Sequence, residues 1–293
     1  MRRVYRVSTL YVIESLGESQ GEPGKRLSER LQQGGAVPQS VDIRYRFVVT
    51  LDDLETVFAE ILASARATGI IPIIHLEAHG GPDGIQLRDT TIIPWKIVGK
   101  MLRSINLETR FNLIVALACC DGIHAIMGFE VDQPSPFAGL IGCEGKIETT
   151  ELFEGYDGFY RVILNGGSLQ AGLSKLKEST NESIGTRHVF YPCERAFIMV
   201  LGKAIRQDQD PDYLEEQRKH YKRTWDRLKA LIGNLVPTTD KEVDALLGPT
   251  WVSTVKEFHS RFFAINEVPG NSKLYDFERL TAAARENLRR QDS

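Results

Sequence analysis

Two short stretches of the sequence combine a chemically reactive side chain with neighbouring glycines. His79 ends an apolar run that begins at Ile70 and is followed by two glycines, and Cys119 and Cys120 end the apolar run NLIVALA. Histidine exchanges a proton near neutral pH and can serve as a general base, while a cysteine thiolate is a strong nucleophile. A free thiol has a pKa of about 8.5, so it needs such a base. Together the stretches indicate nucleophilic catalysis by a thiol.

The elements expected around these residues bring them together. Each apolar run reads as a buried strand, and the roughly 40 intervening residues fit a hairpin around Asp83 to Thr91, a helix from Pro94 to Leu107 and a return strand. That arrangement is one right-handed crossover between parallel strands. Neighbouring strands lie roughly 5 Å apart, so an imidazole at one carboxyl end reaches a thiol at the next.

The rest of the first two thirds of the chain alternates short apolar runs with amphipathic stretches of helical length, which predicts an α/β fold with a largely parallel sheet. We expect strands at residues 4–13, 41–49, 70–78, 112–118, 137–142 and 196–201. Helices are expected at residues 24–33, 52–67, 94–108, 152–165 and 168–178.

After residue 203 the pattern becomes helical, which predicts a core at residues 1–203 and a helical extension at residues 204–293. A long charged helix should follow residue 206 and bury one apolar stripe against the core, the alternative being a helix that binds a partner. Two more helices are expected at residues 240–262 and 274–290. The stripe consists of Leu214, Tyr221, Trp225, Leu228, Ile232 and Leu235.

Composition narrows the classes of function. Of the 293 residues, 42% are hydrophobic and 26% are charged, and the formal charge of −3 gives no basic excess for nucleic acid. No apolar run is long enough to cross a bilayer, so we expect a cytoplasmic protein without a membrane partner. Four scattered cysteines without a Cys-x-x-Cys pair predict neither a disulfide framework nor a metal site. Neither a dinucleotide fingerprint nor a phosphate-binding loop is present, and no cofactor is expected.

A resemblance to a known family rests on these residues. The stretches HLEAHGG and ALACCDG, followed by FAGLIGCEG and FYRVILNGGSLQAGLSKL, resemble the CHAT domain, a branch of the caspase, separase and gingipain group of cysteine proteases. The similarity spans residues 70–178. It implies a caspase-like α/β core, a His-Cys dyad and cleavage of a protein or peptide substrate.

The family pattern assigns roles to individual positions. A His-Gly pair matches His79 and Gly80, and an Ala-Cys pair with glycine three residues on selects Cys119. The Cys-x-Gly pattern of caspases proper would fit Cys120 instead, and because successive strand residues point to opposite faces only one of the two cysteines can face the substrate. The resemblance also implies an oxyanion hole formed by the backbone N–H groups of Gly80 and Cys119. His75 matches a frequent histidine, for which we expect a structural hydrogen bond.

The acidic stretch CEGKIETTELFEGYDGF suggests which substrate side chains the site prefers. In the resembling fold it borders the substrate, so Glu148 and Asp157 are candidates for a pocket that favours Lys or Arg before the scissile bond. The alternative is that these carboxylates only solvate an exposed loop and favour the start of the next helix. The resemblance further suggests a role in bacterial defence or signalling, with an activating partner protein. The rival interpretation is a caspase-like scaffold that has lost activity and serves as an adaptor in a signalling assembly.

Overall fold

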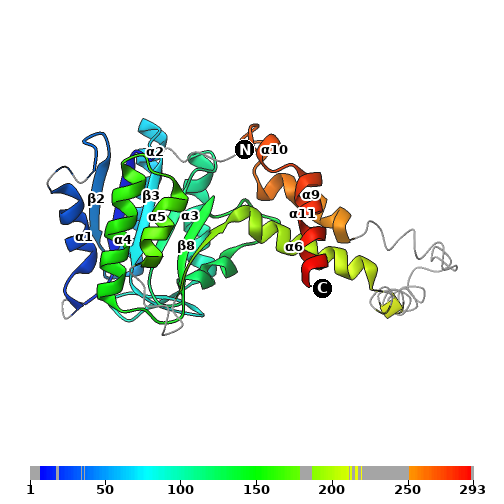
Figure 1. The fold of residues 1–293 in the computed structure, drawn as a ribbon, viewed down its shortest axis with the longest axis horizontal. Helices are drawn as coiled ribbons and strands as arrows, with labels where there is room; N and C mark the ends of the chain where they lie inside the picture. The colour runs from blue at the N-terminus through cyan, green and yellow to red at the C-terminus, as the bar shows by residue number, and fades with distance from the viewer. Residues whose placement is uncertain are drawn as a thin grey trace.

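The computed structural model describes residues 7–17, 20–33, 35, 37–178, 187–210, 212, 215–216, 219 and 251–291. Its centre is a six-stranded sheet of order β2-β1-β3-β7-β8-β9, with helices on both faces (Figure 1). The parallel strands are β1 (Thr9–Glu14), β2 (Asp42–Phe47), β3 (Pro72–Glu77), β7 (Ile114–Ala118) and β8 (Gly139–Glu144). The edge strand β9 (Arg187–Pro192) runs antiparallel to β8. This is the expected α/β class, consistent with a caspase-like fold.

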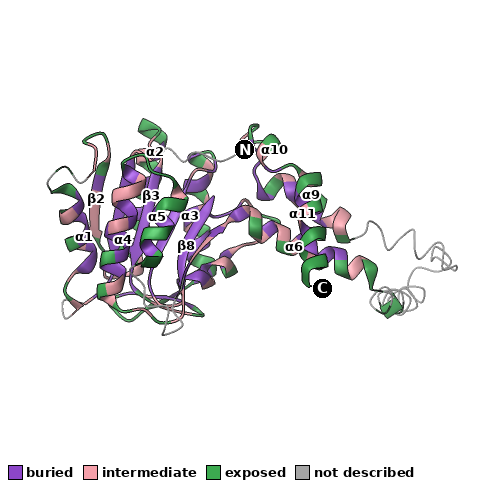
Figure 2. Ribbon diagram, in the orientation of Figure 1, coloured by how far each residue is buried: buried purple, intermediate pink, exposed green. Residues whose placement is uncertain are grey.

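Helices cover the two faces of the sheet separately. One face carries α1 (Pro23–Gln32), α4 (Thr149–Leu164) and α5 (Leu169–Glu178), and the other carries α2 (Leu51–Thr68) and α3 (Trp95–Glu108). Alternation along β3 explains both cores, because Ile73 packs toward α1 and α4 whereas Ile74 and Leu76 pack toward α2 and α3. The central strands β1, β3, β7 and β8 are accordingly buried between the helical layers, whereas the edge strand β2 is only partly buried (Figure 2).

Local sequence signals set the ends of the longest helix on the second face. Thr50 caps α2 by accepting the backbone N–H of Asp53, while the Asp53 carboxylate accepts the N–H of Thr50. Gly69 ends the helix with φ of 66°, a left-handed conformation that suits glycine. Helix α2 therefore starts and stops within a residue of its expected bounds.

A small antiparallel sheet fills the crossover between β3 and α3. It consists of β4 (His79–Gly81), β5 (Gly84–Gln86) and β6 (Ile92–Pro94). The hairpin expected around residues 83–91 corresponds to β5, β6 and their connection. After β7, a 3-10 helix, η2 (Gly122–Gly128), leads toward β8.

One expected strand is wrong. Residues 196–201 lie within α6 (Cys193–Gln209), and the sixth strand is the preceding segment, β9. The apolar run AFIMVL does not distinguish helix from strand, but Phe197, Leu201 and Ile205 recur at helical spacing and are all buried. Helix α6 also runs across residue 203, the expected boundary between core and extension.

The C-terminal helices lie beside the sheet (Figure 1), and their buried side chains form an aromatic cluster. These helices are α6, α9 (Trp251–Phe262), α10 (Asn271–Leu274) and α11 (Phe277–Gln291), and the last matches the helix expected at residues 274–290. Phe262 packs on Phe129 of the core, and the N–H of Ser135 donates to the Phe262 carbonyl at 2.9 Å. All six residues of the expected apolar stripe, from Leu214 to Leu235, lie outside the described residues. No helix in the described part of the chain is long and apolar enough to cross a membrane.

Candidate active site

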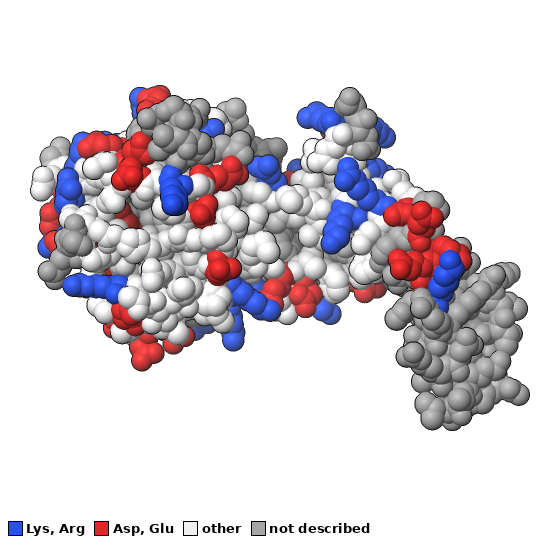
Figure 3. Space-filling view, turned by 90° about the horizontal axis from the view of Figure 1, so that it is seen from below, with Lys and Arg blue, Asp and Glu red and all other residues white. Residues whose placement is uncertain are grey.

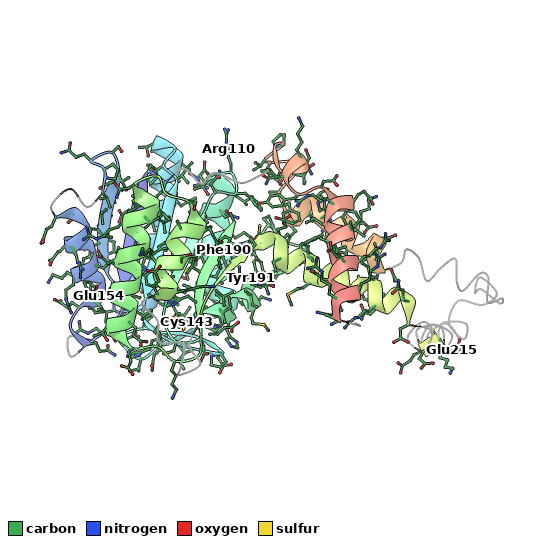
Figure 4. All side chains as sticks on the ribbon, in the orientation of Figure 1. Arg110, Cys143, Glu154, Phe190, Tyr191 and Glu215 are labelled. Carbon is green, nitrogen blue, oxygen red and sulfur yellow. The ribbon has the colours of Figure 1, made fainter. Side chains whose placement is uncertain are left out.

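The histidine and the two cysteines lie at the same edge of the sheet. Strands β3 and β7 are parallel neighbours, and their last paired residues are Glu77 and Ala118. His79 follows the first strand by two residues, while Cys119 and Cys120 follow the second directly. Cys143, labelled in Figure 4, lies near the end of β8 and marks the same edge. The adjacency expected of the two strands is therefore confirmed.

The Cys119 thiol is enclosed between two glycines. A Cβ on Gly80 would lie 2.8 Å from the Cys119 Sγ and 2.3 Å from the Cys120 carbonyl oxygen. A Cβ on Gly122 would lie 3.1 Å from the same Sγ. Only glycine allows so close an approach, so the turn after His79 and the turn after β7 are built to contact each other.

A left-handed residue holds the cysteine turn in place. Asp121 has φ of 54°, and its carboxylate accepts the backbone N–H of Gly145 at 3.0 Å. In return the Asp121 N–H donates to the Gly145 carbonyl at 3.0 Å. Asparagine and aspartate tolerate this conformation better than most residues, which explains Asp121 at the position. The two hydrogen bonds tie the turn to the end of β8.

The two cysteines differ in environment. Cys119 is only 2% exposed and packs with Leu117 in the core beneath α2 and α3, and its burial raises the pKa of the thiol well above its ordinary value. Cys120 is half-buried, and its Sγ lies 4.0 Å from the Ile147 carbonyl oxygen. The thiol of Cys119 is therefore closer to the His79-Gly80 turn, whereas that of Cys120 is more accessible.

His79 is exposed and contacts a residue that the sequence analysis did not single out. Its Nε2 lies 2.8 Å from Nε2 of Gln20, in the segment between β1 and α1. The Gln20 Oε1 accepts the backbone N–H of Gly17 at 2.8 Å. Nothing in its local sequence separates Gln20 from an ordinary surface glutamine. The only available signal was that the loop after β1 opens at the same sheet edge.

A polar network lies buried under α1 and α4, next to this edge. His75 is 1% exposed, with Nδ1 3.0 Å from the Tyr160 hydroxyl and Nε2 3.5 Å from the Glu77 carboxylate. Glu14 accepts the Tyr45 hydroxyl at 2.8 Å and the N–H of Lys25 at 3.1 Å. Burial raises the pKa of Glu14, and the nearby Glu77 raises it further. The contacts of His75 accord with its expected structural role.

The two candidate pocket residues differ in exposure and in ion pairing. Glu148 is exposed and precedes the first turn of α4. Asp157 is 4% exposed, and its Oδ2 accepts Nε of Arg161 at 2.8 Å and lies 3.4 Å from Nε of Arg30. The charge of Asp157 is therefore matched within the protein. Figure 3 shows the face of the molecule that lies at the bottom of Figure 1, toward which the parallel strands point. Acidic and basic side chains are interspersed on this face.

Within the described ranges, no group of three or more His, Cys, Asp or Glu side chains is arranged to hold a metal ion. No protein-family model matches this chain, and no curated protein is similar enough in sequence to match it. The candidate site therefore rests on the geometry of its own residues.

Proposed function

We propose that this chain is a cysteine endopeptidase in which His79 and one of the adjacent cysteines act together. The observation that supports the proposal most strongly is the contact between the two turns, because the Gly80 backbone abuts both Cys119 and Cys120 at the shared carboxyl edge of β3 and β7. A base and a thiol on neighbouring strand ends are near enough for the imidazole to be brought within reach of the thiol, which covalent catalysis requires.

In the proposed reaction His79 takes the proton of the thiol, and the thiolate attacks the carbonyl carbon of a peptide bond. The C=O electron pair moves to oxygen, and the backbone N–H groups of Gly80 and the nucleophilic cysteine stabilise the resulting oxyanion. Collapse of this intermediate breaks the C–N bond, and the amine leaves with the proton from His79. Water then releases the acyl group from sulfur and regenerates the thiol.

Cys119 is the first candidate for the nucleophile because its Sγ lies against Gly80. Burial raises the pKa of its thiol, which favours the neutral thiol over the thiolate in the described arrangement. We therefore propose that a partner protein activates the site by drawing the turn after β7 outward. Cys120, which is already half-exposed, is the alternative nucleophile.

For specificity we propose cleavage after Lys or Arg. Asp157 supports this less than its sequence position suggested, since Arg30 and Arg161 already match its charge. Glu148 remains exposed and available to a basic side chain. A fluorogenic panel that varies only the residue before the scissile bond tests this. Preference for Asp, or no effect of Glu148→Lys on Arg substrates, would contradict it.

The test of the proposed activity is the mapping of cleavage sites by mass spectrometry in a bacterial proteome exposed to the protein. Wild type should generate new peptide termini, and His79→Ala should generate none. Cys119→Ala and Cys120→Ala, compared in parallel, identify the nucleophile. New termini at wild-type levels in the His79→Ala sample would contradict the proposal.

A second candidate function is that of an inactive scaffold. The burial of Cys119 and the engagement of His79 by Gln20 favour it, because neither group is poised for reaction in the described state. An inactive scaffold would give no His79-dependent cleavage under any condition. It would still bind its partners after substitution of both cysteines.

A further inference from the structure

The contact between Gln20 and His79 has a defined polarity. The Gly17 N–H donates to Oε1 of Gln20, so this oxygen is the end of the amide that faces away from the histidine. The Gln20 NH₂ group then lies 2.8 Å from Nε2 of His79. An amide NH₂ has no lone pair to offer and can only donate. Nε2 of His79 must therefore accept, and it carries no proton in this arrangement.

This polarity determines where the neutral ring holds its proton. A neutral imidazole has one N–H and one lone pair, so a ring that accepts at Nε2 carries its proton on Nδ1. The single lone pair of His79 is then occupied by Gln20, and no nitrogen is free to take a proton from a thiol. Protonation of Nε2 would set an N–H against the amide N–H and break the contact.

From this geometry we propose that Gln20 is a positioning residue that holds His79 in the Nδ1–H tautomer and so keeps it from acting as a base until the contact is released. The importance of this for peptide cleavage rests on the proposed function, but the effect on the ring does not. Gln20 lies between β1 and α1, outside the two turns that carry the dyad. A partner or substrate that displaces the Gln20 side chain would release the histidine.

Two substitutions test the proposal. In Gln20→Glu both side-chain oxygens can only accept when ionised, so one can receive the Gly17 N–H and the other a proton-bearing Nε2 of His79. The neutral ring should then switch to the Nε2–H tautomer. Gln20→Leu removes the contact and should leave both tautomers populated. Gln33→Glu is the matched control, because Gln33 is exposed and lies beyond the end of α1.

The tautomer is read directly by nitrogen NMR of the full chain labelled in histidine, with the His79 signals assigned by their loss in His79→Gln. The wild type and Gln33→Glu should show a protonated Nδ1 and an unprotonated Nε2. Alkylation of the site cysteines by iodoacetamide, followed by mass spectrometry, should quicken about two- to tenfold in both Gln20 variants, the range that one neutral hydrogen bond accounts for.

The inference is overturned if wild-type His79 carries its proton on Nε2, or if both Gln20 variants leave the tautomer and the alkylation rate unchanged. These outcomes are separate from those of the proposed function. A tautomer switch in a chain that cleaves no peptide would refute the peptidase and support the role of Gln20. Peptide cleavage with an unchanged tautomer would do the reverse.

Discussion

At the scale of single residues, the buried Cys119 thiol should make the free energy of unfolding fall as the pH becomes alkaline. Its folded pKa is raised by burial, so above about pH 8.5 the unfolded chain loses a proton that the folded chain keeps. This contribution to stability is present below that pH and is lost as pH rises. Between about pH 8 and 9.5 wild type should lose about 1 kcal/mol more than Cys119→Ala, measured by urea denaturation. Parallel curves for the two proteins would contradict the burial of this thiol.

The contact between the turns gives a second prediction at this scale. Gly80→Ala places a Cβ against the Cys120 carbonyl and the Cys119 Sγ, so we expect a loss of about 1–3 kcal/mol in stability together with loss of peptide cleavage. Gly81→Ala is the matched control, because a Cβ there meets no atom within 4 Å. Chemical denaturation and a peptide assay measure both effects. Equal behaviour of the two variants would mean that the turns do not meet as described.

At the scale of elements, the edge strand β9 carries a buried histidine. Burial lowers the pKa of His188 to about 4. Below about pH 6.5 the unfolded chain therefore binds a proton at this histidine that the folded chain does not bind. Stability from this group is complete above that pH and is lost as pH falls toward the folded pKa. At pH 5 the loss is about 2 kcal/mol relative to pH 7.

His188→Asn should remove this part of the acid sensitivity, measured as the free energy of unfolding at both pH values. Because Glu14 and other titrating groups are common to both proteins, their contributions cancel in the comparison. A variant with the same pH dependence as wild type would show that His188 is protonated in the folded chain at mild acidity.

The strands and helices also show which parts of the structure could be predicted from the sequence. The strands and helices of the core were predictable because apolar runs and amphipathic stretches alternate, and because Thr50 and Gly69 mark the ends of α2. The sixth strand could not be predicted, because Phe190 and Tyr191 lie in a short edge segment. This segment forms a strand by pairing with β8, which is distant in the sequence. The placement of His79, Cys119 and Cys120 at one edge of the sheet could be predicted from strand ends and glycines. The contact of Gln20 could not, because it joins loops 59 residues apart.

At the scale of the whole molecule, the C-terminal helices are part of the packed structure. Phe262 is 1% exposed and its ring lies 5.2 Å from that of Phe197 and 5.7 Å from that of Phe129. Phe262→Ala should therefore cost about 3–5 kcal/mol of stability in thermal or urea denaturation. Trp251→Ala, on the same helix but with a side chain 41% exposed, should cost about 1 kcal/mol or less. Similar small losses in both would indicate that the C-terminal cluster does not stabilise the fold.

These helices are not expected to supply a catalytic group. His259 is buried in the aromatic cluster, where its Nε2 donates to the Tyr275 carbonyl, and desolvation lowers its pKa. His220 lies outside the described residues. In the proposed peptidase the extension would stabilise the core or contact an activating partner, and the proposed chemistry would take place at the carboxyl edge of β3 and β7.

The central claim is that His79 activates a cysteine at this edge. The most direct measurement is labelling of the protein, in a bacterial lysate that can supply the activating partner, by a peptide acyloxymethyl ketone with arginine next to the reactive carbon. The thiolate displaces the carboxylate and forms a stable thioether that mass spectrometry can locate. We predict an adduct on Cys119 or Cys120, formed about 100-fold or more slowly in His79→Ala, the contribution of a general base. An absent adduct, or a labelling rate that does not depend on His79, would contradict the account.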